Sequence, residues 1–377
     1  PLFTPDMRIY GDTKVGTLFK EGIDRDDVIA FTEWWNESRD HRRRIYISYD
    51  STNKISQAGD VELLEGGHAK DGPDGSPFVN IAMATDVCEA MPLFYEDYCG
   101  SIVDVSQFEQ MVDKAQALGY RNIGFILDRG GYFSKANIEG LGRRKYNFLI
   151  MAKGRRSLVS SLVLGAKGTF EDTSENTIWE YEVNGTTVEA KLYANDRRVR
   201  CFHIYYSAQN HAAERSVFET SIKKMAGALD RLLGRKCNDL DLDAYGRYFD
   251  LTFSDDDDRV LLMHSKNNGA IDGYIRYCGY FCLISSEKMT AREALLLYKS
   301  RDYSEKLFSA DKTFTGSWAE RIQSVEALRS KIFIEFLALI LRSRLHHAIN
   351  GHIVATGRRP NYMNVVSVLG ELEKIEL

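Results

Sequence analysis

The sequence predicts an α/β protein in which a mixed five-stranded sheet with flanking helices is interrupted by a mainly β insertion. Two observations predict this organisation. Residues 41–154 hold three successive strand patterns followed by two helix-then-strand units, which is typical of a mixed sheet with helical crossovers. Residues 155–285 are dominated by further strand patterns, and the helices that would complete the first layer come only after them. A chain of 377 residues is long enough for both parts to have cores.

The composition indicates a protein without a membrane anchor. The longest apolar segment, residues 332–341, is broken by Glu335 and is shorter than the roughly 20 residues that a membrane span requires. No signal peptide is recognisable, so we expect a cytoplasmic protein. The six cysteines form no CxxC pair and are expected to be reduced thiols.

The formal charge of −5 argues against a protein that coats nucleic acid through bulk charge, because such binding depends on neutralising phosphates. The cations are nevertheless clustered, for example at Arg42 to Arg44 and at Arg143 to Lys145. A local basic track therefore remains open.

The first elements are a peripheral helical segment over residues 1–40 and three strands. Apolar residues from Ile45 to Tyr49 alternate with polar ones, which predicts a strand with Asp50 at its carboxyl end. Strands over residues 78–85 and 91–98 are expected to complete an antiparallel meander.

A helix and a buried strand follow. Ser106 and Glu109 match a capping box, so the helix is expected to begin there and to end at Gly119. The strand after it ends in Asp128. A strand reached through a helical crossover normally lies parallel to an earlier one. If it pairs with the first strand, Asp50 and Asp128 lie side by side at the carboxyl edge, where open α/β sheets place their sites.

A helix over residues 134–145 and a strand over 147–152 complete a β-β-β-α-β-α-β order. This is the order of ribonuclease-H-like folds, in which a later helix carries the last acid. The predicted parts are an N-terminal helical segment (1–40), the first part of the ribonuclease-H-like core (41–154), a β-rich insertion domain (155–285), the second part of the core with its acid-bearing helix and packing helix (286–345), and a C-terminal tail helix (346–377).

Within the insertion, Asn184-Gly185 is a strong signal for a two-residue hairpin turn. The remaining insertion is expected to hold a long basic helix around residues 212–235 and strands over 187–193, 199–206, 248–253, 260–264 and 280–285. After the insertion, a capping box at Ser317 and Glu320 predicts that a long apolar helix begins there and runs to about Arg344.

A capping box at Thr290 predicts a helix from Ala291 that carries a polar stripe. The stripe residues stand at offsets 0, 3, 7 and 14 and lie within roughly 60° of one another on the helix. They are Tyr298, Arg301, Glu305 and Lys312. A solvated outer face is the alternative interpretation of such a stripe.

Asp50, Asp128 and Glu305 together would form a cluster of three carboxylates, which repel one another unless cations neutralise them. Mg²⁺ takes oxygen ligands and keeps coordination sites for water and substrate phosphate. Two such ions about 4 Å apart can activate an attacking hydroxyl and stabilise the leaving oxygen of a phosphodiester. Around this cluster, Arg301 can bind a phosphate bidentately and Tyr298 can donate its hydroxyl to a phosphate oxygen. Lys312 lies two turns beyond Glu305, where it can reach a neighbouring phosphate.

The spacing Tyr-x2-Arg-x3-Glu-x6-Lys resembles the YREK signature of bacterial DDE insertion-sequence transposases of the IS-four type. The segments YDST, with Asp50, and LDRGGYFS, with Asp128, resemble the first and second acidic motifs of that family. The resemblance covers roughly residues 40–345. It implies that Asp50, Asp128 and Glu305 bind two Mg²⁺ or Mn²⁺ ions for strand cleavage at transposon ends and for transfer of the 3′ hydroxyl into target DNA.

The resemblance also implies the partners and further site residues. The partners are double-stranded DNA and a second copy of the chain in a synaptic complex, in the nucleoid-associated cytoplasm of a bacterium. Tyr298, Arg301 and Lys312 are implied to hold DNA near the cleaved end. An aromatic residue of the insertion is implied to stack on a flipped base, and Trp179 is the local candidate, although a hairpin Trp is more often a core residue. Arg129 either contacts phosphate or pairs with an acid.

Other functions stay open at this point. One alternative is a ribonuclease-H-like metal-dependent nuclease without strand transfer, and another is a domesticated, non-catalytic DNA-binding descendant. Hydrolysis of sugars by a carboxylate pair leaves the Arg and Lys of the stripe unexplained. A phosphate-binding Gly-rich loop followed by Lys and Ser or Thr is absent from the sequence, so we do not expect ATP dependence.

Overall fold

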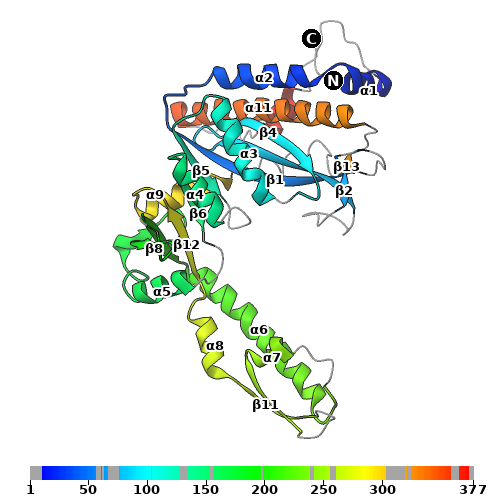
Figure 1. The fold of residues 1–377 in the computed structure, drawn as a ribbon. Helices are drawn as coiled ribbons and strands as arrows, with labels where there is room; N and C mark the ends of the chain where they lie inside the picture. Colours follow the sequence, from blue (N-terminus) through cyan, green and yellow to red (C-terminus); the bar gives the residue numbers. More distant parts are fainter. Residues whose placement is uncertain are drawn as a thin grey trace. The chain divides into compact units, whose positions relative to one another are not determined.

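The computed structural model divides the chain into two compact units (Figure 1). The first unit combines residues Pro1–Met151 and Leu295–Leu377, and the second is Ala152–Ala294. The structure describes residues 11–56, 61, 63–66, 76–102, 104–127, 134–152, 157–196, 198–237, 242–254, 260–302, 319–320, 324–357 and 365–372.

The first unit is built on a mixed sheet. Its strands run in the order β2-β3-β1-β5-β6, and β4 and β13 pair with β3 and β1. The pairs of β3 with β1, β2 and β4 are antiparallel, whereas β5 is parallel to β1 and β6 is parallel to β5. The strands are β1 (Ile45–Ser56), β2 (Glu65–Gly66), β3 (Pro77–Asp86), β4 (Met91–Cys99), β5 (Ile123–Leu127), β6 (Asn147–Met151) and β13 (Ala319–Glu320).

The antiparallel meander of β1, β3 and β4 and the parallel return of β5 are therefore confirmed. Helix α3 (Asp104–Ala117) forms the crossover between β4 and β5, and α4 (Lys135–Arg143) that between β5 and β6. Ser134 caps α4 by accepting the backbone N–H of Asn137, as Ser residues at helix starts commonly do. Helix α3 begins two residues before Ser106, so the capping box predicted at Ser106 is wrong.

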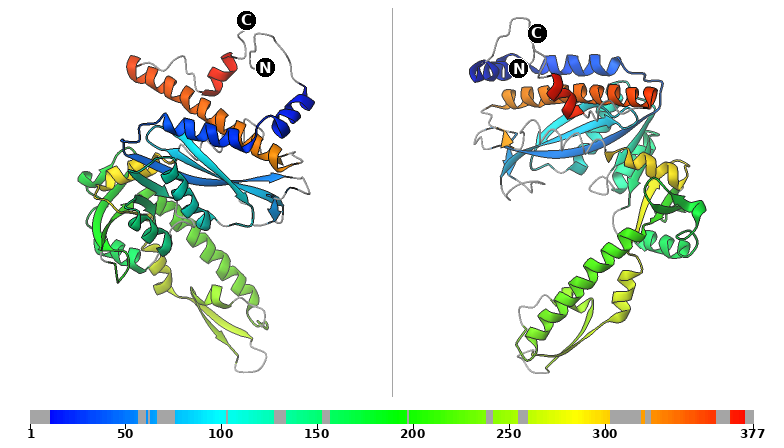
Figure 2. Two further views of the ribbon diagram at one scale, coloured as in Figure 1. Left: turned by 45° about the horizontal axis from the view of Figure 1, so that its top comes forward. Right: turned by 180° about the vertical axis from the view of Figure 1, so that it is seen from behind.

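Helices α2 (Arg25–Glu37) and α11 (Val325–Thr356) cover one face of this sheet (Figure 2). The residues that join them to the sheet include Trp35, Met83 and Phe336, which belong to one buried apolar cluster. The indole of Trp35 donates to the carbonyl of Pro92 on β4 at 2.9 Å. Helix α2 is thus part of the core of this unit, and its description as peripheral is wrong.

The opposite face of the sheet packs on α3. The ring of Phe108 lies 6.2 Å from that of Tyr49 on β1 and 5.6 Å from that of Phe125 on β5. Because both strands carry a large ring toward the same helix residue, α3 fixes their alignment from this side. The sheet is therefore covered by helices on both faces, which is the expected state of a sheet with parallel strands.

Helix α11 begins at Val325, where Ser324 accepts the backbone N–H of Ala327, and ends at Gly357, whose φ of 65° is left-handed. The capping box predicted at Ser317 and Glu320 is wrong, because Glu320 belongs to β13. There, pairing of two residues with the end of β1 satisfies the backbone in place of a helix turn.

The other helices of the first unit are α1 (Asp12–Glu21) and α12 (Val365–Leu372). Among the described helices of the chain, none combines the length and the apolar character that crossing a membrane requires.

The second unit holds an antiparallel sheet and a helical extension. The sheet has the order β12-β9-β8-β7, from β7 (Thr177–Ile178), β8 (Val183–Lys191), β9 (Val199–Tyr206) and β12 (Tyr280–Ser285). The extension has its own small apolar core, whose buried members include Phe218, Leu229 and Phe249. The elements of the extension are α6 (Ala208–Leu232), α7 (Leu242–Gly246), α8 (Asn268–Ile275) and the hairpin β10–β11 (Phe249–Phe253 and Leu261–Lys266). Helix α5 (Ser157–Ala166) and the short 3-10 helix η1 (Ser174–Asn176) precede the sheet in sequence.

The hairpin turn predicted at Asn184-Gly185 is wrong, because both residues lie inside β8. The glycine serves packing instead. A Cβ atom at position 185 would lie 2.8 Å from the ring of Tyr205 and 3.1 Å from the Cβ of Ala291. Gly185 is therefore present because another side chain crosses the strand closely, a known use of glycine in strands.

Candidate active site

Asp50, the first predicted catalytic acid, lies in the middle of β1. Strand β1 continues six residues beyond it to Ser56, so the prediction that Asp50 ends its strand is wrong. The extra length is paired with β3, where Asp50 stands opposite Met83 and Ile55 opposite Phe78. On its other side, the described residues of β1 and β5 pair from Ile45 to Ser48. Asp50 lies two residues beyond the last described pair of this parallel ladder.

Asp50 is partly exposed, while the residues on either side of it in β1 are buried. Its Oδ1 accepts the backbone N–H of Ser51 at 2.9 Å. Alternation along the strand places Asp50, Thr52 and Lys54 on one face of the sheet. The ion pair between Lys54 and Glu335 shows that this face is the one covered by α11.

The four residues after Asp50 are an uncommon feature, because polar side chains are rarely buried in succession. Ser51, Thr52, Asn53 and Lys54 are all buried. The amide of Asn53 donates to Oδ1 of Asn80 on β3, and the Asn80 amide in turn donates to the carbonyls of Cys99 and Ile102. The strand that carries Asp50 is thus fixed by polar contacts on both of its faces.

The ion pair of Lys54 and Glu335 was not predicted from the sequence. Lys54 is 2% exposed, and its partner on α11 is buried as well. A buried charge needs a partner to offset desolvation, so the pair holds β1 and α11 in one relative position.

Asp128 and Arg129 lie outside the described residues, as do Glu305 and Lys312. The register of the two parallel strands nevertheless bears on the site. Ser48 on β1 pairs with Ile126 on β5, and β5 ends at Leu127. In the sequence, Asp50 follows Ser48 by two residues, and Asp128 follows Ile126 by two residues.

Tyr298 lies on α9 (Ala291–Lys299), which begins as predicted. Thr290 and Glu293 form the predicted capping box, since each side chain accepts the backbone N–H of the other residue. These hydrogen bonds from Thr290 also lower the pKa of Glu293.

The prediction that one helix carries the entire stripe is wrong, because α9 ends at Lys299, before Arg301. The hydroxyl of Ser300 donates to the carbonyl of Leu297, a local hydrogen bond of the kind that competes with helix continuation. Tyr298 and Arg301 are 3% and 7% exposed, so neither lies on a solvated outer face. The Arg301 guanidinium carbon lies 4.9 Å from the centre of the Tyr298 ring, a cation–π contact.

Trp179 lies in the second unit, in the turn between β7 and β8. It is 74% exposed, so the alternative that this tryptophan is a core residue is wrong. The neighbouring Glu180 forms an ion pair with Arg292, and Glu182 has a positive φ of 53° at the end of the turn. The turn therefore presents a large aromatic ring to solvent.

A metal centre cannot be assembled from the described residues alone. Within them, no three His, Cys, Asp or Glu side chains converge in a way that could hold an ion. Asp50 is the member of the predicted ligand set that the structure describes.

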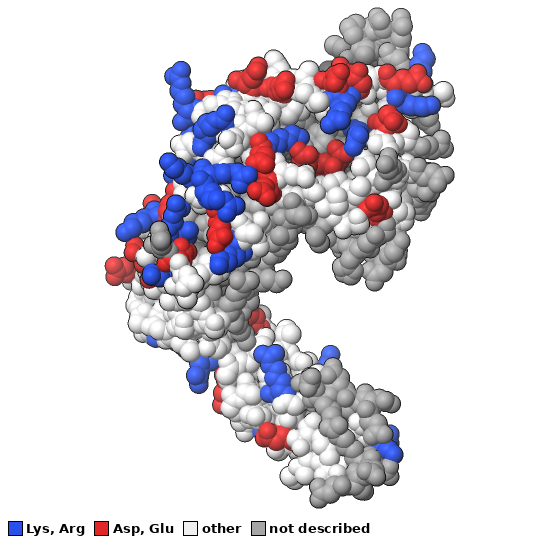
Figure 3. All heavy atoms as spheres, viewed as in Figure 1, with Lys and Arg blue, Asp and Glu red and all other residues white. Residues whose placement is uncertain are grey.

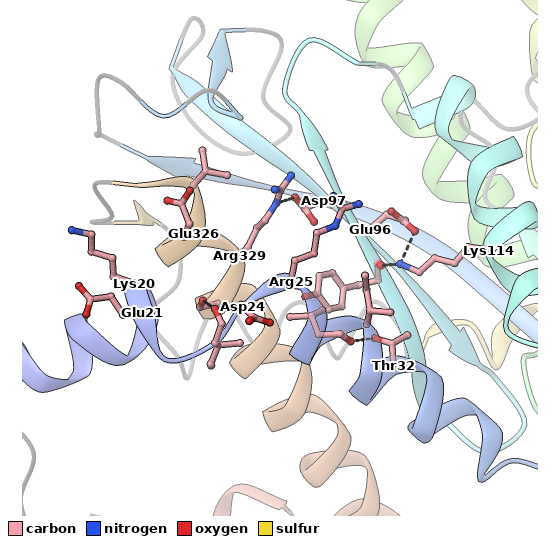
Figure 4. Close-up of a pocket in the computed structure, with 16 residues that line it drawn as sticks. Lys20, Glu21, Asp24, Arg25, Thr32, Glu96, Asp97, Lys114, Glu326 and Arg329 are labelled. Atoms are coloured by element: carbon pink, nitrogen blue, oxygen red, sulfur yellow. Dashed lines mark hydrogen bonds and ion pairs between the residues drawn. The ribbon is translucent and has the colours of Figure 1, made fainter.

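A separate cleft of about 470 Å³ lies in the first unit between α1, α2, β4 and α11 (Figure 4). Its lining carries charges of both signs, and two ion pairs lie within it, Arg329 with Asp97 at 3.0 Å and Lys114 with Glu96 at 2.7 Å. Asp50 is not part of its lining. The mixed charges give this cleft no clear preference for an anionic or a cationic ligand.

Comparisons with known proteins identify a family. A family model described as the transposase DDE domain matches residues 54–341, a segment that includes Asp128 and Glu305 and begins four residues after Asp50. No curated protein matches the chain.

Among solved structures, the chain is similar to a piggyBac transposase synaptic complex with hairpin DNA. The identity is 9%, the match covers 93% of this chain and 56% of that one, and the TM-score is 0.47. A Mos1 mariner paired-end complex with Mn gives 11% identity, coverage of 45% and 53%, and a TM-score of 0.22. The chain thus spans about half the length of these solved proteins. Because the family match extends over residues 54–341, more than half of the sequence, the protein belongs to the transposase DDE-domain family.

Proposed function

We propose that this protein is a metal-dependent DNA transposase of the IS-four type, which cleaves strands at transposon ends and joins the 3′ hydroxyl to target DNA. Membership of the transposase DDE-domain family supports the reaction class. The observation that carries the assignment of residues is the register of β1 and β5, which pairs Ser48 with Ile126. Asp50 and Asp128 each follow this pair by two residues in the sequence, so the proposal places both carboxylates at one level of the sheet.

The order of elements supports a ribonuclease-H-like core with an insertion. Three antiparallel strands precede two crossover units in the first unit, as that core requires. The second unit, Ala152–Ala294, interrupts the first in sequence. We therefore propose that the core comprises residues 41–154 and 286–345, with the β-rich insertion at 155–285 between them.

We propose that Asp50, Asp128 and Glu305 hold two Mg²⁺ or Mn²⁺ ions. The chemistry of this donor set fits, because carboxylate oxygens are the ligands that both ions prefer. The partial exposure of Asp50 fits as well, because a ligand to a substrate-binding ion has to be reached from solvent. When bound, such ions activate the attacking hydroxyl and stabilise the leaving oxygen of the phosphodiester.

The protein's own contribution is to position these groups. Strand β1 holds Asp50 between β3 and α11 through the buried contacts of Asn53 and Lys54, so little reorganisation of this carboxylate accompanies substrate binding. Lys312 and Arg129 are proposed phosphate-binding residues. For Tyr298 and Arg301, their burial and mutual stacking favour a role in which the pair is held ready beside the DNA end.

Trp179 is proposed to stack on a base extruded from the duplex. Its exposure supports this role, because a stacking platform must be reached by the base. We further propose that two copies of the chain act together on paired transposon ends, with double-stranded DNA as the substrate.

The experiment that tests the assignment measures cleavage and strand joining by purified protein on DNA that carries the element's terminal repeats, with Mg²⁺ or Mn²⁺. Replacing Asp50, Asp128 or Glu305 by the corresponding amide removes a metal ligand and should lower cleavage by more than about 100-fold. Replacing a residue that only hydrogen-bonds to a ligand typically costs about 10- to 100-fold. Asp26→Asn, on the exposed side of α2, is the matched control and should cleave normally.

Each alternative function gives a different result in this experiment. Cleavage without branched products from precleaved ends would identify a nuclease that lacks strand transfer. DNA binding without any metal-dependent cleavage in the unmodified protein would identify a non-catalytic descendant. Cleavage that persists in the Asp50→Asn variant would overturn the ligand assignment itself.

A further inference from the structure

A group of cations lies at the amino-terminal edge of the parallel strands of the first-unit sheet. Asp50 lies toward the opposite, carboxyl-terminal edge. Strands β1, β5 and β6 are mutually parallel, so their amino-terminal ends lie at one edge. The residues that precede these strands include Arg42, Arg121, Arg143 and Lys145. We refer to these four side chains as the amino-edge cations.

The strand register brings the amino-edge cations together. Ile45 pairs with Ile123, and its N–H donates to the carbonyl of Asn122 at 3.2 Å. Gly124 pairs with Asn147 in the next strand. Neighbouring strands are about 4.8 Å apart, so the segments that enter the three strands lie within about 10 Å of one another. Figure 3 shows Lys and Arg side chains gathered over this part of the first unit.

The amino-edge cations are exposed, and none of them forms an ion pair with a carboxylate in the part of the chain that the structure describes. The acids nearby are engaged by other arginines. Arg43 contacts both Asp86 and Glu89, and Arg144 contacts Glu109 and Asp113, with the closer contact at 2.8 Å. These four carboxylates are thus neutralised by a second set of cations, and the nearby Asp40 accepts the backbone N–H of Arg42 at 3.0 Å. The side-chain charges of the exposed four remain available to another partner.

Lys145 follows the end of α4 in the left-handed region, with a φ of 59°. The N–H of Lys145 donates to the carbonyl of Gly142, and the N–H of Tyr146 donates to that of Leu141. This conformation ends α4 and leads the chain into β6, so Lys145 lies at the amino edge of the sheet.

We propose that the amino-edge cations bind the phosphate backbone of double-stranded DNA, as a second contact surface separate from the catalytic edge. The inference rests on the proposed function for its choice of duplex DNA as the ligand. Three of the four residues are arginines, which bind phosphate oxygens bidentately.

A phosphate backbone fits this surface better than an acidic protein does. Protein interfaces need apolar or aromatic anchors at their centre. None of the large exposed hydrophobic side chains in the described chain belongs to residues 38–45, 119–124 or 142–147. The surface therefore offers charge and hydrogen-bond donors without an apolar anchor.

The amino-edge surface and Asp50 cannot contact the same few phosphates. Asp50 lies five residue steps after Ile45 in β1, a distance of about 17 Å along the strand. DNA on the amino edge is therefore either the flank of a bound duplex or a second duplex. In both cases it adds affinity without approaching the carboxylates.

The test measures binding of a fluorescent duplex of arbitrary sequence by anisotropy, in EDTA, between 50 and 200 mM KCl. The triple variant R42Q/R143Q/K145Q is compared with K14Q/K20Q/R25Q, which removes the same charge from α1 and α2 of the same unit. Arg121 is left unchanged because it also donates to the carbonyl of Tyr120. Circular dichroism and thermal melting check that both variants fold.

Each lost phosphate contact lowers the slope of log affinity against log salt by about 0.9. The amino-edge variant should therefore lose about 2 to 3 units of slope and bind about 10- to 100-fold more weakly at 100 mM KCl, while the control keeps the slope of the unmodified protein. An unchanged slope in the amino-edge variant, or an equal loss in the control, overturns the proposal. So does a change in self-association without DNA, measured by sedimentation, which would assign the surface to a protein partner.

Because this assay contains no metal, its outcome is independent of cleavage. If Asp50 proved unnecessary for cleavage, the salt dependence of the amino-edge variant would still be interpretable. If the amino-edge variant bound DNA normally, the role of Asp50 in cleavage would be unaffected. The two proposals therefore fail separately.

Discussion

The buried ion pair between Lys54 and Glu335 gives a prediction whose size follows from the structure. Lys54→Met removes one charge and leaves the other buried between β1 and α11. The two side chains are 2% and 10% exposed, so the remaining carboxylate would be nearly fully desolvated. Removing one partner of such a pair costs about 3–5 kcal/mol of unfolding free energy. We expect the single variant to lose this amount.

The double variant Lys54→Met with Glu335→Leu should recover most of that loss, because an apolar pair of similar volume often replaces a buried ion pair at little cost. The control is Lys135→Met, which breaks the exposed pair with Glu139 at 3.7 Å in the same unit. Pairs of that kind contribute about 0.2–1 kcal/mol.

The assay is urea unfolding followed by tryptophan fluorescence in a Trp179→Phe background. The other three tryptophans then all belong to the first unit, so the signal reports the unit that contains the pair. A single-variant loss below about 1 kcal/mol, or a double variant as unstable as the two single variants added together, would falsify the reasoning that desolvation makes this pair interdependent.

Three further predictions concern the second unit. Burial lowers the pKa of His203 to about 4, so between about pH 6.5 and 4 the unfolded state binds a proton that the folded state does not. The unfolding free energy should therefore fall by about 3 kcal/mol from pH 6.5 to pH 4, and an unfolding free energy that does not change with pH would contradict this. Gly185→Ala should cost about 1–3 kcal/mol, because its Cβ would lie 2.8 Å from the ring of Tyr205. Gly165→Ala, with nothing within 4 Å, is the control and should be neutral or slightly stabilising by thermal melting. Trp179→Ala removes a ring that is 74% exposed, so the melting temperature should not change while cleavage of transposon ends decreases; equal cleavage would remove Trp179 from the proposed site.

Alternation along β1 and the order of strands and helices were sufficient to predict the meander of β1, β3 and β4 and the parallel return of β5. The helix between β4 and β5 implies this return, so the strand order followed from local pattern and handedness. The short strands β2 and β13 were not predicted. The carboxyl end of β1 was not predictable in the same way. Residues 51–54 are polar and read as a loop, yet pairing with β3 and buried hydrogen bonds keep them in the strand.

The capping-box pattern predicted one helix start correctly and two wrongly. At Thr290 the reciprocal hydrogen bonds form, whereas Ser106 lies inside α3 and Glu320 pairs with β1 as a strand. A pattern of two residues cannot include the competing tertiary contacts. Gly185 is a similar case, since a turn and a close ring contact both require glycine, and only the position of Tyr205 distinguishes them.

For the candidate site, the sequence placed Asp50 and Asp128 on neighbouring parallel strands, and the pairing of β1 with β5 agrees with that placement of the strands. The stacking of Arg301 on Tyr298 and the end of α9 at Lys299 were not predicted. Helical periodicity assumes that a helix continues, whereas α9 ends at Lys299 and the next residue, Ser300, donates its hydroxyl to the carbonyl of Leu297.

The position of Asp50 within β1 has a mechanical consequence. A carboxylate at the tip of a strand can swing with the following loop, but Asp50 has hydrogen-bonded strand on both sides and a polar anchor on each face of the segment beyond it. Its coordinates are therefore set by the sheet itself. Any adjustment that brings reacting groups into line when a duplex arrives has to be made by the groups that approach this fixed oxygen pair.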